Sequence, residues 1–64
     1  MPARERQYLV QEQDDGTIAT VGARSHVGAI RRYLFKHPRT PEGTELRVKE
    51  REVDEPWVTY RVSR

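Results

Sequence analysis

The chain contains no cysteine, which removes two of the usual ways of stabilising a small domain. Without thiols it can form neither a disulfide framework nor a thiolate metal site, and such a composition is typical of a reducing, intracellular setting. It also has no apolar run near the length that spans a bilayer, and residues 1–6 do not resemble an apolar leader. We therefore expect a cytoplasmic protein that does not enter a membrane and carries no cofactor or metal.

Large apolar side chains are scarce as well. Of 64 residues, 34% are hydrophobic and 8% aromatic, while 34% are charged. A chain of this size buries only about 60% of the surface that its unfolded form exposes. We expect one small domain over residues 1–64, with a frayed N-terminus at residues 1–5. Its thin core leaves room for a second copy or a partner to cover apolar surface.

The positive charge is unevenly distributed and comes mostly from arginine. The chain carries 12 basic and 10 acidic residues, and ten of the basic residues are arginine. Residues 16–43 hold five basic side chains against Glu42 alone. The planar guanidinium pairs well with phosphate or carboxylate, so this field favours an anionic partner. A coding bias toward arginine explains the same count equally well.

The first third of the chain predicts a hairpin. Residues 6–13 place Tyr8 and Val10 on one parity, and the run 14–17, Asp-Asp-Gly-Thr, favours a tight turn with positive φ at both central positions. Residues 17–23 then form the returning strand. Ile18 and Val21 have opposite parity there, so one of them lies on the wrong face or a bulge intervenes.

A helix is predicted next. Ser25 can cap its first turn, and Pro38 requires it to end near His37. The three- and four-residue spacing of Val27, Ile30 and Leu34 predicts the buried stripe of an amphipathic helix of about three turns.

In the last twenty residues, Leu46 and Val48 alternate with polar residues, and so do Val58, Tyr60 and Val62. This spacing predicts a second hairpin, with strands at 45–53 and 57–63 around residues 54–56. Glu50 and Glu52 share the parity of the apolar residues, so the hairpin tip must project beyond the helix or contain a bulge. The dry face of this hairpin consists of Leu46, Val48, Val58, Tyr60 and Val62.

These elements predict an α+β fold with the order ββαββ, in which one helix covers one face of a four-stranded sheet. A right-handed crossover over the first strand gives the strand order 2-1-3-4, with every neighbouring pair antiparallel. The order 2-1-4-3 is the alternative, and it would make the first and last strands parallel neighbours. The expected core consists of Tyr8, Val10, Ile18, Val27, Ile30, Leu34, Leu46, Val48, Val58, Tyr60 and Val62.

The uncovered face of the sheet is the candidate working surface. A row of cations beside an aromatic platform is how single-stranded nucleic acid is bound, because phosphates pair with the cations and a base stacks on the ring. A second basic surface follows the helix, although charged helix faces are ordinarily only solvated. The candidate nucleic-acid-binding residues are Arg47, Lys49, Arg51, Trp57 and Arg61, and the secondary basic surface is Arg24, Arg31, Arg32 and Lys36.

Catalysis finds little support in the residue pattern. Ser25 and His26 are adjacent at a helix start, where their side chains diverge. His26 and His37 are about 16 Å apart along one helix, too far to share a metal ion. The glycines at 22 and 28 lack the lysine that ends a phosphate-binding loop. We therefore expect a protein that is not an enzyme.

Two functions fit this sequence. The first is a small non-catalytic nucleic-acid-binding module whose partner is single-stranded nucleic acid. The alternative is a protein-interaction or homodimerisation module that docks through an edge strand and Trp57.

Overall fold

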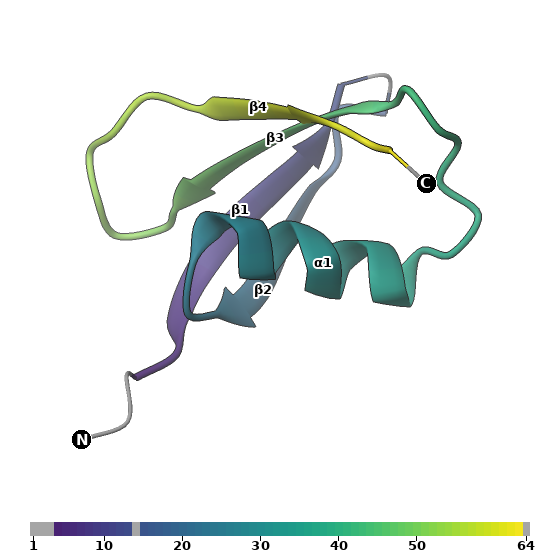
Figure 1. Ribbon diagram of the computed structural model, residues 1–64. Helices are drawn as coiled ribbons and strands as arrows, with labels where there is room; N and C mark the ends of the chain where they lie inside the picture. The colour runs from purple at the N-terminus through teal and green to yellow at the C-terminus, as the bar shows by residue number, and fades with distance from the viewer. Residues whose placement is uncertain (1–3, 14, 64) are drawn as a thin grey trace.

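The computed structural model describes residues 4–13 and 15–63 and has the expected ββαββ architecture. Strands β1 (Arg6–Glu12), β2 (Ile18–Ala23), β3 (Glu45–Glu50) and β4 (Val58–Arg61) form an antiparallel sheet in the order β2-β1-β3-β4. Helix α1 (His26–Lys36) lies across one face (Figure 1). The predicted α+β class and the strand order 2-1-3-4 are confirmed, whereas the alternative 2-1-4-3 is not. The prediction of a frayed N-terminus at residues 1–5 concerns mainly residues 1–3, which lie outside the described residues.

The helix begins and ends where the sequence predicts. Ser25 is extended at the N-cap, and its hydroxyl accepts a hydrogen bond of 3.0 Å from the amide of Gly28. At the other end the His37 amide donates to the carbonyls of Tyr33 and Leu34. Pro38 follows directly, and the residue before a proline is driven out of the helical region. Capping and proline together fix the length of α1.

The buried face of α1 differs from the predicted stripe. Ala29, Ile30 and Tyr33 are its buried residues, whereas Val27 is 47% exposed and Leu34 is half-buried. The prediction that Val27 belongs to the core is therefore wrong. The helix packs mainly against β2, β3 and β1, so its face is rotated away from β4. A small residue at 29 allows this close approach, and the apolar spacing alone does not reveal it.

The core lies between α1 and the three strands beneath it. Its largest fully buried side chains are Tyr8, Leu46, Val10 and Val48, and Val62 is also buried. Two further expected members are wrong, because Ile18 is 50% and Val58 is 39% exposed. Val58 points to the helix side of the sheet, but α1 does not extend over β4.

The pairing of β1 with β2 settles the conflict between Ile18 and Val21 without a bulge. The register runs unbroken from Arg6 opposite Ala23 to Gln11 opposite Ile18. Val21 therefore points into the core opposite Tyr8, and Ile18 lies on the opposite face. With Ile18 on the outer face, the side chains of β2 alternate regularly between the core and the outer face.

The first hairpin forms through a wider loop than the predicted Asp-Gly turn. The Gly16 amide donates to the Glu12 carbonyl at 2.9 Å, and the Gln11 side chain donates to the Gly16 carbonyl at 3.0 Å. Gly16 has φ of 75°, whereas Asp15 does not adopt positive φ. Residue 14 lies outside the described residues. A turn with positive φ at two central positions is therefore replaced by a loop that needs only one glycine.

Candidate nucleic-acid interface

The face of the sheet opposite α1 brings most of the predicted binding residues together. The registers align Ile18, Gln11, Arg47 and Thr59 in one row across the four strands. The neighbouring row contains Thr20, Leu9 and Lys49, with Trp57 next to Lys49 just before β4 begins. No described helix lies on this face. Side-chain alternation predicted this grouping correctly, because cross-strand neighbours share a face.

Lys49 and Trp57 form the centre of this surface. The Lys49 ammonium lies 5.7 Å from the centroid of the Trp57 ring, within the range of a cation–π contact. Trp57 remains 36% exposed, and Arg47 is exposed one row away. Together with Arg47, the pair therefore presents an aromatic ring and two positive charges on one open surface.

Arg51 and Arg61 lie at opposite ends of the same surface. The Arg51 amide donates to the Gln7 carbonyl at 2.8 Å, which continues the pairing of β3 with β1 by one residue beyond the strand. Arg61 faces Glu45 with an ion-pair distance of 3.7 Å, and both side chains are well exposed. The charge of Arg61 is therefore partly neutralised, whereas Arg47 and Lys49 form no ion pair with an acidic residue among residues 4–13 and 15–63.

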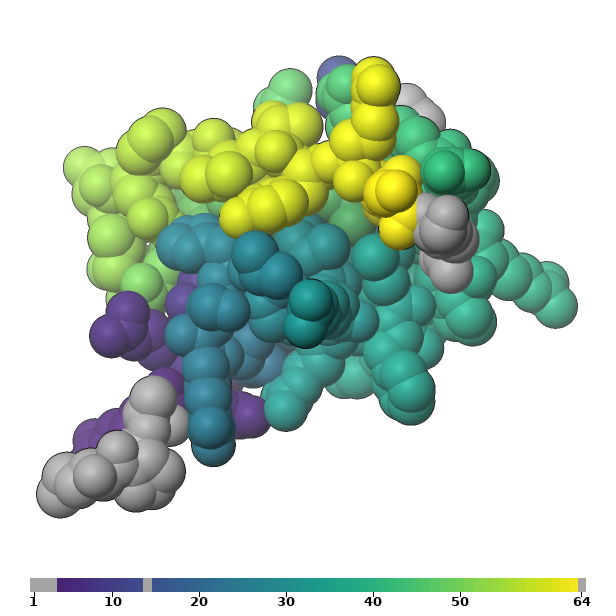
Figure 2. Space-filling view, in the orientation of Figure 1, coloured from purple at the N-terminus to yellow at the C-terminus, as the bar shows by residue number. Residues whose placement is uncertain are grey.

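The secondary basic surface does not join this face. Arg31 and Lys36 lie on α1, which covers the other side of the sheet; the space-filling view looks onto that side, where the helix lies beside β4 (Figure 2). Arg24 is exposed at the end of β2. Arg32 is engaged: it donates to the Gly22 carbonyl at 2.8 Å and pairs with Glu5 at 2.9 Å. Three of the four residues are thus exposed cations remote from Trp57, and the fourth has a structural role.

The loop between β3 and β4 is fastened to the helix by a pair that the sequence did not reveal. A Glu55 carboxylate oxygen accepts hydrogen bonds from the Glu50 amide at 2.7 Å and from the His26 ring at 2.8 Å. Pairing between β3 and β4 stops at Val48 opposite Val58, so Glu55 supplies the acceptor that a longer strand would have given Glu50. His26 also meets the ring of Tyr8 edge-on, with centroids 5.0 Å apart. This loop positions Trp57.

The Glu55 contacts should make stability depend on pH. The hydrogen bond from the Glu50 amide, followed by that from His26, lowers the pKa of Glu55 below its ordinary value of 4.5. A lowered folded-state pKa contributes stability above that ordinary value, and the contribution is lost as pH falls through the folded-state pKa. Glu55→Gln should therefore be less stable than the parent at pH 7, with a difference that shrinks toward pH 3 in urea unfolding. Glu52→Gln, exposed in the same loop, is the control; a gap for Glu55→Gln that persists at low pH would contradict this role.

The position of Glu50 explains why two glutamates share the parity of the apolar residues in the last hairpin. Its side chain is on the core side of the sheet opposite Tyr8, is 17% exposed and pairs with Arg6 at 3.5 Å. Glu52 lies beyond the end of β3 and is exposed. β3 therefore ends at Glu50, without a bulge, and the loop continues past the first turn of α1 (Figure 1).

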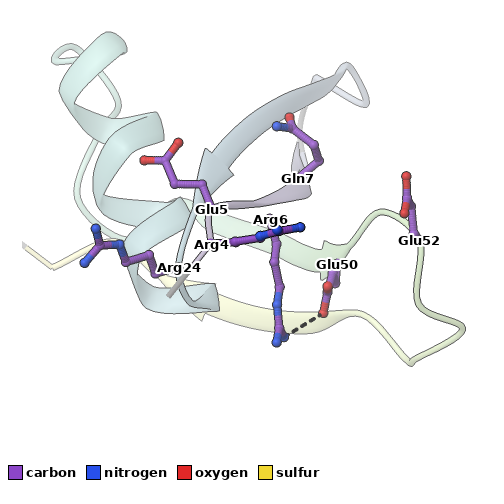
Figure 3. Close-up of a pocket in the computed structure, with 7 residues that line it drawn as sticks. All are labelled: Arg4, Glu5, Arg6, Gln7, Arg24, Glu50 and Glu52. Atoms are coloured by element: carbon purple, nitrogen blue, oxygen red, sulfur yellow. Dashed lines mark ion pairs between the residues drawn. The ribbon is translucent and has the colours of Figure 1, made fainter. Parts of the chain in front are cut away.

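A hollow of about 600 Å³ lies beside this end of the sheet. Arg6 reaches toward Glu50 within it, whereas Glu5, Gln7 and Glu52 point in different directions (Figure 3). Its charges are of both signs and partly paired with each other, so it does not resemble an anion site. The lining residues are Arg4, Glu5, Arg6, Gln7, Arg24, Glu50 and Glu52.

A second hollow of about 380 Å³ lies at the C-terminal end of α1. The ring of His37 stacks on Tyr33 with centroids 4.3 Å apart, and the Tyr33 hydroxyl donates to Glu12 at 3.3 Å. Burial, followed by the charge of Glu12, raises the pKa of Tyr33. These contacts fasten the helix end to β1. In the described part of the chain, no three histidine or acidic residues are grouped to hold a metal ion.

Comparisons with known proteins do not add a family to this description. No family model, curated protein or solved structure matches the chain. Within residues 4–13 and 15–63, no helix has the length and apolar character needed to cross a membrane.

Proposed function

We propose that this protein is a small, non-catalytic, cytoplasmic module that binds single-stranded nucleic acid on the uncovered face of its sheet. The observation that carries the proposal is the placement of Trp57 and Lys49 beside Arg47 on a face that α1 leaves open. Aromatic platforms flanked by cations bind single strands with little sequence preference, since every base has a π-face. The lack of cysteine is compatible with a reducing compartment.

Each residue has a distinct role in this proposal. A base stacks on the exposed part of the Trp57 ring, while Lys49 holds the ring from one side and contributes its charge. Arg47 pairs with a phosphate next to the stacked base. Arg51 and Arg61 extend the positively charged surface toward its two ends. Arg61 contacts both the bound nucleic acid and Glu45. The helix cations add only long-range attraction, because α1 lies on the other side of the sheet.

Binding should weaken strongly when the ring is removed. Stacking of one base on an aromatic side chain contributes about 1–3 kcal/mol by alanine substitution, so Trp57→Ala should lower affinity about 5- to 150-fold. The affinity should also fall with salt at a logarithmic slope of about −2 to −3, as for three or four phosphate contacts to a single strand. Anisotropy of a labelled mixed-sequence 12-nucleotide strand measures both effects, and Trp57 fluorescence reports binding by the parent.

Matched arginine variants separate binding on this face from general electrostatic attraction. Arg47→Ala should reduce affinity clearly more than Arg31→Ala, which removes an arginine that is also exposed, but on the helix. Equal losses in the two variants would contradict the assigned surface. No change in anisotropy or Trp57 fluorescence at low salt would rule out nucleic-acid binding altogether.

A second function, protein docking through an edge strand and Trp57, is favoured by a different observation. β4 is the outermost strand of the sheet, and its Val58 is 39% exposed on the helix side. Such an edge can accept another strand. The two proposals share Trp57 but otherwise use different groups, since nucleic acid would contact outer side chains and a protein strand would contact the backbone of the edge.

A further inference from the structure

The free edge of β4 presents unpaired backbone groups in a regular pattern. Val62 both donates to the Thr44 carbonyl and accepts from the Gly43 amide, so its backbone groups point toward β3. Backbone direction alternates along a strand, so the backbone groups of Trp57, Thr59 and Arg61 point away from β3. Because β4 ends the sheet, no other described strand pairs with them.

The other edge of the sheet is partly obstructed. Backbone direction in β2 turns the Gly22 carbonyl outward, and Arg32 donates to that carbonyl at 2.8 Å. The same guanidinium is held by Glu5 at 2.9 Å. A charged side chain folded over an edge strand blocks the approach of another strand. Among the described residues, β4 has no comparable side chain bonded to its outward backbone groups.

We propose that the partner of this edge is a second copy of the chain, with the two β4 strands paired antiparallel about a two-fold axis at Thr59. This inference does not rest on nucleic-acid binding. An antiparallel pair related by a two-fold axis must have that axis perpendicular to the sheet, so both helices lie on the same side. With Thr59 opposite its own copy, the outward backbone groups of Trp57, Thr59 and Arg61 form six hydrogen bonds between the chains.

This register also matches the side chains. Trp57 lies opposite Arg61 of the second copy, which gives its ring a second cation in addition to Lys49. On the helix side, the exposed Val58 lies opposite the half-buried Tyr60 of the second copy, an aromatic and β-branched pair. A register centred on Tyr60 is less favourable, because it moves the two Arg61 side chains closer together.

The interface should be modest in strength. A stable complex buries about 1,200–2,000 Å² of accessible surface, and two short strands bury less. We therefore expect a dimer that dissociates on dilution. Sedimentation equilibrium from micromolar to millimolar concentration should therefore show a reversible change between monomer and dimer. A monomer throughout that range would overturn the proposal.

Proline substitutions on the two edges identify which strand pairs. Thr59→Pro removes an outward amide that the sheet itself does not use, and the loss of two intermolecular hydrogen bonds should weaken the dimer roughly 30-fold. Thr20→Pro is the matched control, because its amide points outward from β2 in the same way. It should leave the dimer unchanged. Circular dichroism establishes that both variants fold; weakening by Thr20→Pro but not by Thr59→Pro would refute pairing through β4.

A charge exchange tests the register without a change in the backbone. Thr59→Lys and Thr59→Glu each place like charges opposite each other at the two-fold axis, so each variant alone should be more monomeric than the parent. An equimolar mixture should form a heterodimer. Two variants that dimerise as well as the parent, or a mixture that stays monomeric, would refute the Thr59 register. Because the mass is measured without oligonucleotide, failure here leaves nucleic-acid binding untouched, and the reverse also holds.

Discussion

Replacing Leu46 by alanine should lower the free energy of unfolding by about 2–5 kcal/mol. Leu46 is fully buried in β3 between the helix and the sheet, and truncation of such a leucine costs about 2–5 kcal/mol because of lost transfer energy and a residual cavity. A domain of 64 residues has about 3–10 kcal/mol of stability in total. The substitution therefore removes a large part of the free energy of unfolding. Urea unfolding followed by Trp57 fluorescence measures the loss.

Val53→Ala provides the control for Leu46→Ala. Val53 is 41% exposed in the loop after β3, so its truncation should change stability by no more than about 0.5 kcal/mol. Equal losses for the two variants would show that Leu46 does not occupy the centre of the core. The urea dependence of the unfolding free energy should stay the same in both variants, because the surface exposed on unfolding is nearly unchanged.

Enlarging Ala29 to leucine should destabilise the fold by about 1–3 kcal/mol, even though leucine forms helices well. Ala29 is fully buried where α1 meets the sheet, so three additional carbons have no space unless the helix moves outward. Thermal unfolding by circular dichroism should show a clear decrease in melting temperature. At about 4–8 °C per kcal/mol for a domain of this size, the expected decrease is about 4–24 °C.

Val27→Leu is the matched control on the same helix. Val27 is 47% exposed, so a larger side chain is tolerated there and the effect on stability should stay within about 0.5 kcal/mol. If Val27→Leu were as harmful as Ala29→Leu, the buried face of α1 would be the one that the apolar spacing predicts. The pair of variants therefore distinguishes the two orientations of the helix.

The fold was predictable from sequence wherever a local rule decided it. Ser25 and Pro38 determine the ends of α1, and alternation around Leu46 and Val48 determines which side of β3 is dry. The orientation of α1 was not predictable in the same way. The orientation depends on how the helix crosses the sheet. Ala29 is buried because its small side chain fits where α1 contacts the sheet, and the spacing of large apolar residues does not predict this.

The candidate site also has a part that local rules predict and a part that they do not. Parity alone placed Arg47, Lys49 and Trp57 on one face, because strand geometry fixes cross-strand neighbours. The contact between His26 and Glu55 spans 29 residues and depends on the shape of an irregular loop. Such contacts follow from the assembled fold rather than from spacing.

The contact between Arg32 and Gly22 bears on how large an assembly this chain can form. A sheet with two open edges adds copies without limit and grows into fibres, whereas a sheet with one open edge stops after the first addition. Because Arg32 already occupies the outward carbonyl of Gly22 on β2, the two-fold pair that we propose through β4 would offer a third molecule only a partly blocked edge. A hydrogen bond far from Trp57 would thus make growth beyond the proposed dimer less favourable.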